Sequence, residues 1–239
     1  MKIVCNIPHA GATIPDWALA DFTVAQSDLA RLVNKLVDQN VDALFSFVAD
    51  EGKVVSNIAR IVVDMERYRD DAAEPMSKLG MGLFYEKDDE GRQIRHRGAT
   101  YDKCLALYDE YHSELESKVQ TCVEETGHCY VIDCHSFHDE MHHTDYPTSE
   151  YPDVCLGINE ETPAKEVVWV KDLFKRNGYS VKYNVPFAGS LVPLKYFGDS
   201  RVKSIMIELN RRIYCNNADN FRRVQNLCKE VYLHLSKQC

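Results

Sequence analysis

Five polar residues stand at or near the ends of apolar runs, where a fold can present chemistry. His9 follows the first run, and Asp64 and Arg67 end the next one. His135 and Glu208 stand near the ends of two later runs. Imidazole and carboxylate groups bind divalent metals and transfer protons, and arginine grips anions. Together, these residue types point to metal-assisted hydrolysis.

The four runs have the composition of buried strands. They span residues 3–9, 61–67, 130–137 and 205–211, and each stops abruptly in polar or charged residues. Apolar, β-branched runs of this kind are typical of a parallel sheet, in which ligands gather outside the carboxyl ends of the strands. If the four strands lie side by side, the five polar residues converge on one site.

The rest of the chain alternates helical and extended patterns. Apolar spacing and end signals predict helices over 28–40 (capped by Ser27), 101–125, 163–177 and 218–235. Further short strands are expected over 41–48, 153–157 and 179–183. Glycine and proline mark long loops over 72–100 and 184–197, which would close over a substrate. The pattern predicts an α/β fold in a single domain, residues 1–239.

Composition and charge exclude several classes of protein. The chain has 239 residues, of which 45% are hydrophobic and 27% charged, as in ordinary globular domains. Its net charge of −9 argues against a general surface for nucleic acid or anionic membranes. No stretch approaches the roughly 20 apolar residues of a membrane span. We therefore expect a small anionic substrate as partner, held by a few arginines, with homo-oligomer formation left open.

The nine cysteines indicate a reducing compartment. Their number is odd, no CxxC pair occurs, and several lie on apolar runs or in helical patterns. The N-terminal apolar run is also too short for a secretory signal. Free thiols in the cytoplasm are the expected state.

His9 and His135 are the candidate metal ligands. Catalytic zinc usually takes three protein ligands and keeps one position open for water. A carboxylate would complete the set, and the candidates are Asp38, Asp42, Asp64 and Asp133. The alternative is that each histidine is an ordinary hydrogen-bonding loop residue, since no self-sufficient motif such as HExxH is present. The pairing of two histidines at strand ends favours the metal.

Glu208 is the candidate general base. It stands among aliphatic residues, where a carboxylate is costly unless it is paired or its pKa is raised. A base that activates water benefits from such tuning. The equally weighted alternative is a salt bridge to Arg211 or Arg212.

Arginines flank two of the runs. Arg60 and Arg67 enclose Asp64, and Arg211 follows Glu208 closely. A guanidinium at a strand end suits a bidentate grip on a carboxylate. For any single arginine, an ion pair with a neighbouring acidic residue is more common than a contact with a substrate carboxylate.

Other chemistries have weaker signals. His138 and His142 are four residues apart and would face one way on a helix as a second metal cluster, but the surrounding residues favour a solvated or substrate-facing loop. Cys134 and His135 are strand neighbours that point to opposite faces, which argues against a nucleophilic dyad. No GxSxG elbow, P-loop or GxGxxG occurs.

Six short motifs, in this order, resemble the N-formylglutamate amidohydrolase family. They are Pro8-His9-Ala10-Gly11 with Ile14-Pro15; Asp38 with residues 41–45; Arg60 to Arg67; Asp133 to Phe137; Asn184 to Gly189; and Ile207 to Arg211. Tyr111-His112 also matches a pair that the family tends to carry on its long helix. The likeness covers most of the chain, from Ile3 to about Tyr214.

The resemblance implies a zinc-carboxypeptidase-like fold, three-layer α/β/α with a central mixed, mostly parallel sheet. It implies hydrolysis of an N-formyl or N-acyl amino acid such as N-formylglutamate, with Zn²⁺ as cofactor. By position, His9 and His135 resemble zinc ligands, and Asp38 the third ligand or an adjacent site residue. Glu208 resembles the general base. The resemblance implies that Arg60 and Arg67 are catalytic. Together with Arg211, they would bind the substrate carboxylates and the oxyanion. Further implied substrate-binding residues are Ser136, His112 and Asn184.

The chain departs from the pattern at three positions. The His-x-x-Glu pair of the carboxypeptidases is absent, because position 12 is Ala12, which leaves the third ligand open. Gln39 replaces an expected tryptophan, and Ser190 replaces a glycine. One alternative is therefore a zinc peptidase or amidohydrolase on another N-acyl or short peptide substrate. The other is a metal-binding homologue without catalysis.

Overall fold

The computed structural model describes residues 2–139, 147–160 and 162–238. Close contacts group the chain into two compact units. The first, here called the sheet unit, comprises Met1–Ile7, Gln39–Val54 and Leu115–Cys239. The second, the loop unit, comprises Pro8–Asp38 and Val55–Glu114. That the whole chain works as one domain stays a prediction.

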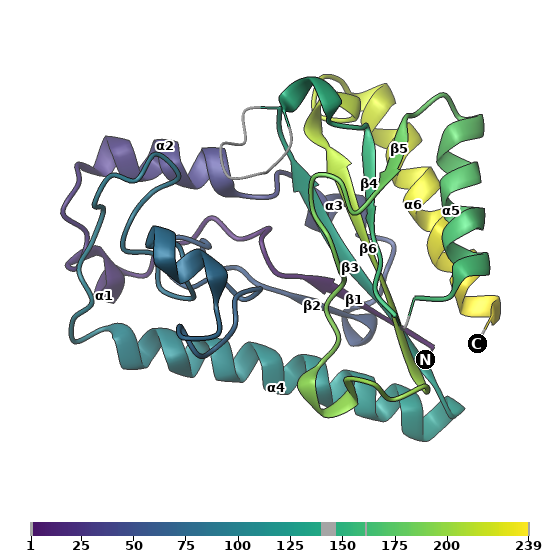
Figure 1. The fold of residues 1–239 in the computed structure, drawn as a ribbon, viewed down its shortest axis with the longest axis horizontal. Helices are drawn as coiled ribbons and strands as arrows, with labels where there is room; N and C mark the ends of the chain where they lie inside the picture. Colours follow the sequence, from purple (N-terminus) through teal and green to yellow (C-terminus); the bar gives the residue numbers. More distant parts are fainter. Residues whose placement is uncertain (1, 140–146, 161, 239) are drawn as a thin grey trace. The chain divides into compact units, whose positions relative to one another are not determined.

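The sheet unit is built on a mixed sheet of six strands in the described part of the chain (Figure 1). The strands are β1 (Ile3–Ile7), β2 (Lys53–Val55), β3 (Cys129–Phe137), β4 (Val154–Gly157), β5 (Val181–Tyr183) and β6 (Val202–Asn210). Their order across the sheet is β2-β1-β3-β6-β4-β5. β3 runs parallel to β1 and β6, β4 runs parallel to β5, and β4 pairs antiparallel with β6. The predicted α/β fold with a mixed, mostly parallel sheet is confirmed.

The central strands bury the apolar runs on both faces. Every residue of β1 and β3 is buried, as is every residue of β6 except Lys203. Runs such as Tyr130-Val131-Ile132 suit a parallel sheet that is covered on both sides. The register of β3 and β6 places His135 directly opposite Glu208. Two of the predicted site residues are thus neighbours in one sheet.

Amphipathic helices of the sheet unit pack against these strands. α5 (Ala164–Arg176) contacts β4 and β5, and α6 (Ala218–Gln238) contacts β1. α5 and α6 also contact each other and lie side by side in Figure 1. The short helix α3 (Val41–Leu44) packs on β3 and α6. The apolar faces of these helices bury Val167, Val170, Phe174, Val224, Cys228 and Val231.

The loop unit has little regular structure. Its helices are α1 (Asp16–Leu19), α2 (Gln26–Leu36) and the first part of α4 (Tyr101–Thr126), which continues from Leu115 in the sheet unit. α2 buries Leu29, Leu32 and Leu36 at helical spacing. Short 3-10 helices in the two units are η1 (Asp50–Gly52), η2 (Pro75–Leu79), η3 (Thr148–Glu150), η4 (Leu194–Tyr196) and η5 (Arg211–Ile213).

Three predictions of local structure are wrong. Residues 41–48 contain the helix α3 instead of a strand, and this helix follows Asn40 in the left-handed conformation (φ 60). Residues 61–64 are buried but form no strand, since 60–62 are a turn and 63–64 are irregular. An apolar run fits a buried strand and a packed loop equally well, so periodicity could not separate the two. α2 begins at Gln26 after Ala25, so Ser27 lies inside the helix and is not its cap.

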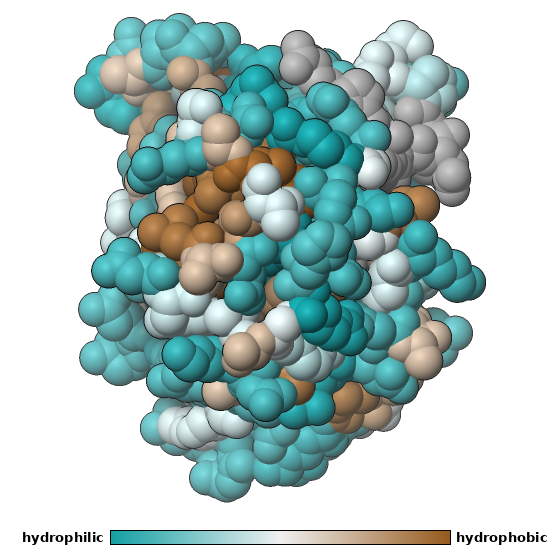
Figure 2. Space-filling model, turned by 90° about the vertical axis from the view of Figure 1, so that its left-hand side faces the viewer, coloured by the Kyte–Doolittle hydropathy of each residue, from teal (hydrophilic) through white to brown (hydrophobic). Residues whose placement is uncertain are grey.

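The face of the molecule in Figure 2 is mainly polar. Most of this face is hydrophilic, and hydrophobic areas lie between the hydrophilic ones. Among the residues that the structure describes, no helix combines the length and the apolar character needed to cross a membrane.

Candidate functional site

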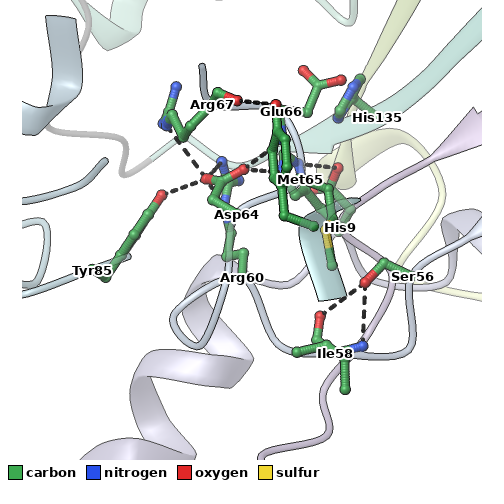
Figure 3. A network of polar contacts seen from close by, with 12 residues as sticks. His9, Ser56, Ile58, Arg60, Asp64, Met65, Glu66, Arg67, Tyr85 and His135 are labelled. Carbon is green, nitrogen blue, oxygen red and sulfur yellow. Dashed lines mark hydrogen bonds and ion pairs between the residues drawn. The ribbon is translucent and has the colours of Figure 1, made fainter. Parts of the chain in front are cut away.

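Asp64 is the centre of a buried polar cluster in the loop unit (Figure 3). Its Oδ1 accepts hydrogen bonds from His9 Nε2 at 2.7 Å and from the Glu66 backbone N–H at 3.0 Å. Its Oδ2 accepts two hydrogen bonds from Arg60, with Nε at 3.2 Å and Nη2 at 2.9 Å. The hydroxyl of Tyr85 donates to the same oxygen at 2.8 Å. One carboxylate thus fixes the positions of four other residues.

Arg60 and Arg67 both pair with Asp64. Arg67 Nε forms an ion pair with Asp64 Oδ2 at 3.4 Å. Burial opposes ionisation of Asp64, but Arg60, His9 and Arg67 together hold its pKa well below the usual value. Burial likewise opposes the charge of Arg60, yet Asp64 raises the pKa of Arg60 well above its usual value. Both guanidinium groups are thus held beside one carboxylate, and a guanidinium at such a site is suited to bind an anion.

Close backbone packing positions the chain that follows His9. A Cβ on Gly11 would lie 2.2 Å from the carbonyl carbon of Asn57. The neighbouring Thr13 donates its N–H to Asn57 O at 3.1 Å and accepts from the Ala59 N–H at 2.9 Å. Only glycine allows such an approach. The motif after His9 is therefore packed on the chain that leads into the Asp64 cluster.

His9 and Asp38 are buried neighbours in the loop unit. His9 Nδ1 lies 3.8 Å from Asp38 Oδ2, and the Asp38 N–H donates to the His9 carbonyl at 2.8 Å. Because His9 Nε2 donates to the ionised Asp64, the lone pair of the neutral imidazole is on Nδ1. A nitrogen lone pair beside a carboxylate oxygen is a donor set that suits zinc.

His112, on α4, supports the backbone next to Asp64. Its Nε2 donates to the Met65 carbonyl at 2.8 Å, and its ring lies against Tyr108 with 4.2 Å between centroids. Burial lowers the pKa of His112. The ring is therefore neutral near pH 7, and Nε2 carries the proton that Met65 accepts.

Asp133 plays the corresponding part at the end of β3 in the sheet unit. Its Oδ1 accepts hydrogen bonds from Asn6 Nδ2 at 2.8 Å and from His135 Nε2 at 3.1 Å. Its Oδ2 accepts from the Leu191 N–H at 3.0 Å, which ties the loop 184–197 to the strand. His135 therefore repeats the arrangement of His9, with Nε2 bound to a buried carboxylate.

Glu208 lies between His135 and Cys155 in a row across three strands. It is the register partner of His135 on β3 and of Cys155 on β4, and register partners point to the same face of a sheet. Glu208 is 7% exposed, and Cys155 belongs to an apolar cluster with Phe137 and Tyr151. Burial and the nearby Glu208 raise the pKa of Cys155 to about 12, so this thiol stays protonated. The carboxylate of Glu208 thus lies beside a neutral, largely apolar wall.

The other predicted substrate contacts have partners inside the sheet unit. Arg211 Nε donates to Ser136 Oγ at 3.4 Å. Asn184 Oδ1 accepts from the N–H groups of Ile158 at 2.8 Å and Gly189 at 3.2 Å, and Nδ2 donates to the Ile158 carbonyl at 3.3 Å. These bonds hold the start of the loop 184–197. A substrate-binding role for Ser136, Arg211 and Asn184 stays a prediction.

The predicted residues form two groups, one in each unit. The loop unit brings together His9, Asp38, Arg60 and Arg67, with His112 against the adjoining backbone. The sheet unit brings together His135 with Glu208, and Ser136 with Arg211, whereas Asn184 bonds to loop backbone. Of the second candidate metal cluster, His142 lies outside the described residues.

Sequence reasoning missed Tyr85 and Asn6. Tyr85 stands in the irregular stretch 72–100, which has no periodic signal. Asn6 is a polar residue inside an apolar strand, and this could have identified it. Asp64 and Asp133, two further candidates for the carboxylate ligand, each accept a hydrogen bond from a histidine Nε2.

Comparison with known proteins adds four findings. The sequence model of the N-formylglutamate amidohydrolase family matches residues 1–215. The crystal structure of an N-formylglutamate amidohydrolase from Ralstonia eutropha JMP134 has a TM-score of 0.82 and 22% sequence identity, covering 100% of this chain and 94% of that one. The crystal structure of a gene product from Agrobacterium tumefaciens has a TM-score of 0.67 and 16% identity, covering 99% and 89%. None of the curated proteins matches the chain.

At these identities the likeness to solved structures concerns the fold alone. The family match is independent of them, and it spans all the site residues described above. From this match, the chain belongs to the N-formylglutamate amidohydrolase family, a family of hydrolases.

Proposed function

We propose that this chain is a zinc-dependent amidohydrolase that cleaves the amide bond of an N-formyl or N-acyl amino acid such as N-formylglutamate. The family supplies the reaction class. The observation that carries the proposal is that His9 and His135 make the same kind of hydrogen bond. Each binds a buried aspartate through Nε2, at 2.7 and 3.1 Å. This contact sets the ring tautomer so that the lone pair is on Nδ1.

The proposed zinc ligands are His9, Asp38 and His135. Two histidines and one carboxylate are a common donor set of catalytic zinc. Within the loop unit, His9 Nδ1 and Asp38 Oδ2 are buried and 3.8 Å apart, which supports their binding to one ion. The aspartates behind the histidines would orient the rings and raise their basicity. When bound, zinc supplies Lewis-acid polarisation of the acyl carbonyl and makes its water more acidic.

Glu208 is the proposed general base. It would accept a proton from the attacking water and donate it to the leaving amide nitrogen. Its low exposure and the protonated Cys155 beside it support this role, because they limit the competing water around the carboxylate.

The two guanidinium groups held beside Asp64 support an anionic substrate. We propose that one of the two arginines, Arg60 or Arg67, stabilises the developing oxyanion and that the other holds a substrate carboxylate. The remaining proposed substrate contacts are Ser136, His112, Asn184 and Arg211.

Two broader expectations belong to this proposal. The first is that the fold resembles that of the zinc carboxypeptidases. The other is a location in the reducing cytoplasm, which is supported by the free thiols of the eight cysteines in the described residues.

Metal content and a substrate panel test the proposal. We expect about one zinc per chain in the wild type, loss of zinc in His135→Ala, and retention in the control His128→Ala, since His128 lies outside the polar clusters. A wild type without zinc, even after incubation with it, would remove the metal mechanism. Turnover only of other N-acyl compounds or short peptides would support the first alternative. Zinc without turnover of any of them would support a non-catalytic homologue.

The base is tested separately. We expect Glu208→Gln to keep its zinc and to lose most of the turnover, because glutamine has nearly the same shape but cannot accept the proton. An active Glu208→Gln enzyme would show that another group accepts the proton.

A further inference from the structure

We propose that Arg95 is a positioning residue for the Asp64 cluster, because its guanidinium joins the two segments of the loop unit that form this cluster. The first segment, 60–67, carries Asp64 and both arginines. The second segment, 83–86, carries the tyrosine that donates to Asp64. The inference rests on the proposed function, since it concerns the geometry of groups that would act on the substrate. Arg95 itself makes its contacts with backbone atoms of the two segments.

One edge of the guanidinium binds one carbonyl from each segment. Arg95 Nε donates to Tyr85 O at 2.8 Å, and Arg95 Nη2 donates to Val62 O. Val62 stands two residues before Asp64, and the hydroxyl of Tyr85 donates to Asp64 Oδ2 at 2.8 Å. Two parallel donors held in one plane are a property of arginine and not of lysine. Arg95 therefore sets the distance between the backbones that carry Asp64 and its tyrosine partner.

Other bonds also hold these segments. The Asp64 N–H donates to Leu83 O at 2.9 Å, which links the two segments in addition to Arg95 and the Tyr85 hydroxyl. From α4, His112 and Tyr108 bind the carbonyls of Met65 and Arg67 in the first segment. Cys104 Sγ donates to Val62 O at 3.4 Å, but it belongs to α4 and not to the second segment. The first segment belongs to no strand of the described sheet, since residues 60–62 form a turn and 63–64 are irregular. In the absence of regular structure, a side-chain bridge has a large share in the geometry.

Aromatic rings fix the plane of the guanidinium. The Arg95 Cζ lies 3.3 Å from the ring centroid of Phe84 and 5.0 Å from that of Phe22. Stacking of this kind suits the flat guanidinium and orients both donors toward the two carbonyls. The side chain is fully buried, and it is the largest by volume of the fully buried side chains among the described residues.

The buried charge of Arg95 is poorly compensated. Burial lowers the pKa of Arg95 to about 10, and Nη1 is a buried donor without a hydrogen-bond partner in the described part of the chain. A buried charge is costly unless it is paired and hydrogen-bonded. The bridge to two carbonyls accounts for an arginine at this position.

The test compares Arg95→Met and Arg95→Lys with a matched control, Arg97→Met. Arg97 is on the same stretch but is 42% exposed and pairs with Asp71. We expect both Arg95 variants to fold and to bind zinc like the wild type, with kcat lowered about 10²-fold, as a misplacement near 1 Å produces, and with KM changed far less. We expect Arg97→Met to match the wild type. Tyr85→Phe combined with Arg95→Met should lower kcat less than the product of the single effects, since both act on Asp64.

Hydrogen–deuterium exchange supplies a readout that does not depend on turnover. In Arg95→Met we expect faster exchange in 60–67 and 83–86 and unchanged exchange in the sheet unit. A wild type that turns over no substrate would remove the proposed function, and this exchange pattern would still test the bridge. Unchanged kcat, unchanged exchange in both segments, or unfolding of both Arg95 variants would each overturn the positioning role.

Discussion

Asp64 contacts His9, both arginines and Tyr85, so a single substitution tests how these residues depend on one carboxylate. Asp64→Asn keeps the size of the side chain but leaves two partly buried guanidinium groups without this counter-ion. We expect the free energy of unfolding to fall by about 3 kcal/mol or more. Because the ring of His9 loses its orienting partner, zinc affinity should fall about 10–100-fold. Urea denaturation and zinc titration measure the two effects.

Asp109→Asn is the matched control for this substitution. Asp109 also pairs with an arginine, Arg69, at 2.7 and 2.9 Å, but its side chain is 49% exposed. Exposed pairs contribute little. We expect unchanged zinc affinity and little change in stability. If Asp64→Asn binds zinc as tightly as the control, Asp64 does not orient a metal ligand.

At the scale of single residues, the sequence predicted those groups that end an apolar run. His135 and Glu208 were predicted this way, and the register of β3 and β6 makes them neighbours, while their roles stay a prediction. Tyr85 and Arg95 could not be found, because their importance comes from contacts with Asp64 and with Val62 O. A stretch without periodicity gives no indication of which distant carbonyl a side chain will reach.

At the scale of elements, three of the four predicted site-bearing strands exist and the fourth does not. β1, β3 and β6 pair in parallel and bury their runs in the sheet. The equally apolar stretch 60–64 is buried too, but its backbone groups bond elsewhere. The Asp64 N–H donates to Leu83 O, and Val62 O accepts from Arg95 and Cys104. Buried backbone must be hydrogen-bonded, yet a sequence does not specify whether a ladder or a side chain does this.

The end of β4 offers a test at the same scale. A Cβ on Gly157 would lie 2.0 Å from Gly189 O and 2.4 Å from Met206 Cε, so the loop 184–197 packs directly on this glycine. We expect Gly157→Ala to lower the free energy of unfolding by about 1–3 kcal/mol through overpacking. The loop should also shift, which would weaken the bond from Leu191 N–H to Asp133. Denaturation and amide exchange at Leu191 measure these effects.

Gly98→Ala is the control for Gly157→Ala. A Cβ on Gly98 would lie 3.8 Å from its nearest neighbours, Asp21 Oδ1 and the His96 carbonyl, which is an ordinary contact distance. We expect no loss of stability there. Equal effects of the two substitutions would show that the contact of Gly157 with the loop is not a close one.

At the scale of the whole molecule, the family match and the structure cover different lengths of chain. The match ends at residue 215, whereas α6 (Ala218–Gln238) follows it and buries Val224, Cys228 and Val231. Amphipathic spacing predicted this helix without any resemblance. The spacing of apolar residues thus predicts structure further along the chain than the family motifs do. The motifs, in turn, identify the chemistry that this spacing leaves open.

The proposed zinc ligands come from sequence positions as far apart as His9 and His135, so an unfolded chain does not preserve the site. Binding to the folded chain alone stabilises it by about 2.7 kcal/mol when free zinc is 100 times its Kd. We expect this rise in the free energy of unfolding when zinc is added to chelator-treated protein, measured by urea denaturation. His135→Ala should show no rise, because it lacks a ligand, and His128→Ala should respond like the wild type. Identical unfolding of the wild type with and without zinc would mean that the folded chain has no specific zinc site, and His9 and His135 would then be hydrogen-bonding residues of their aspartates.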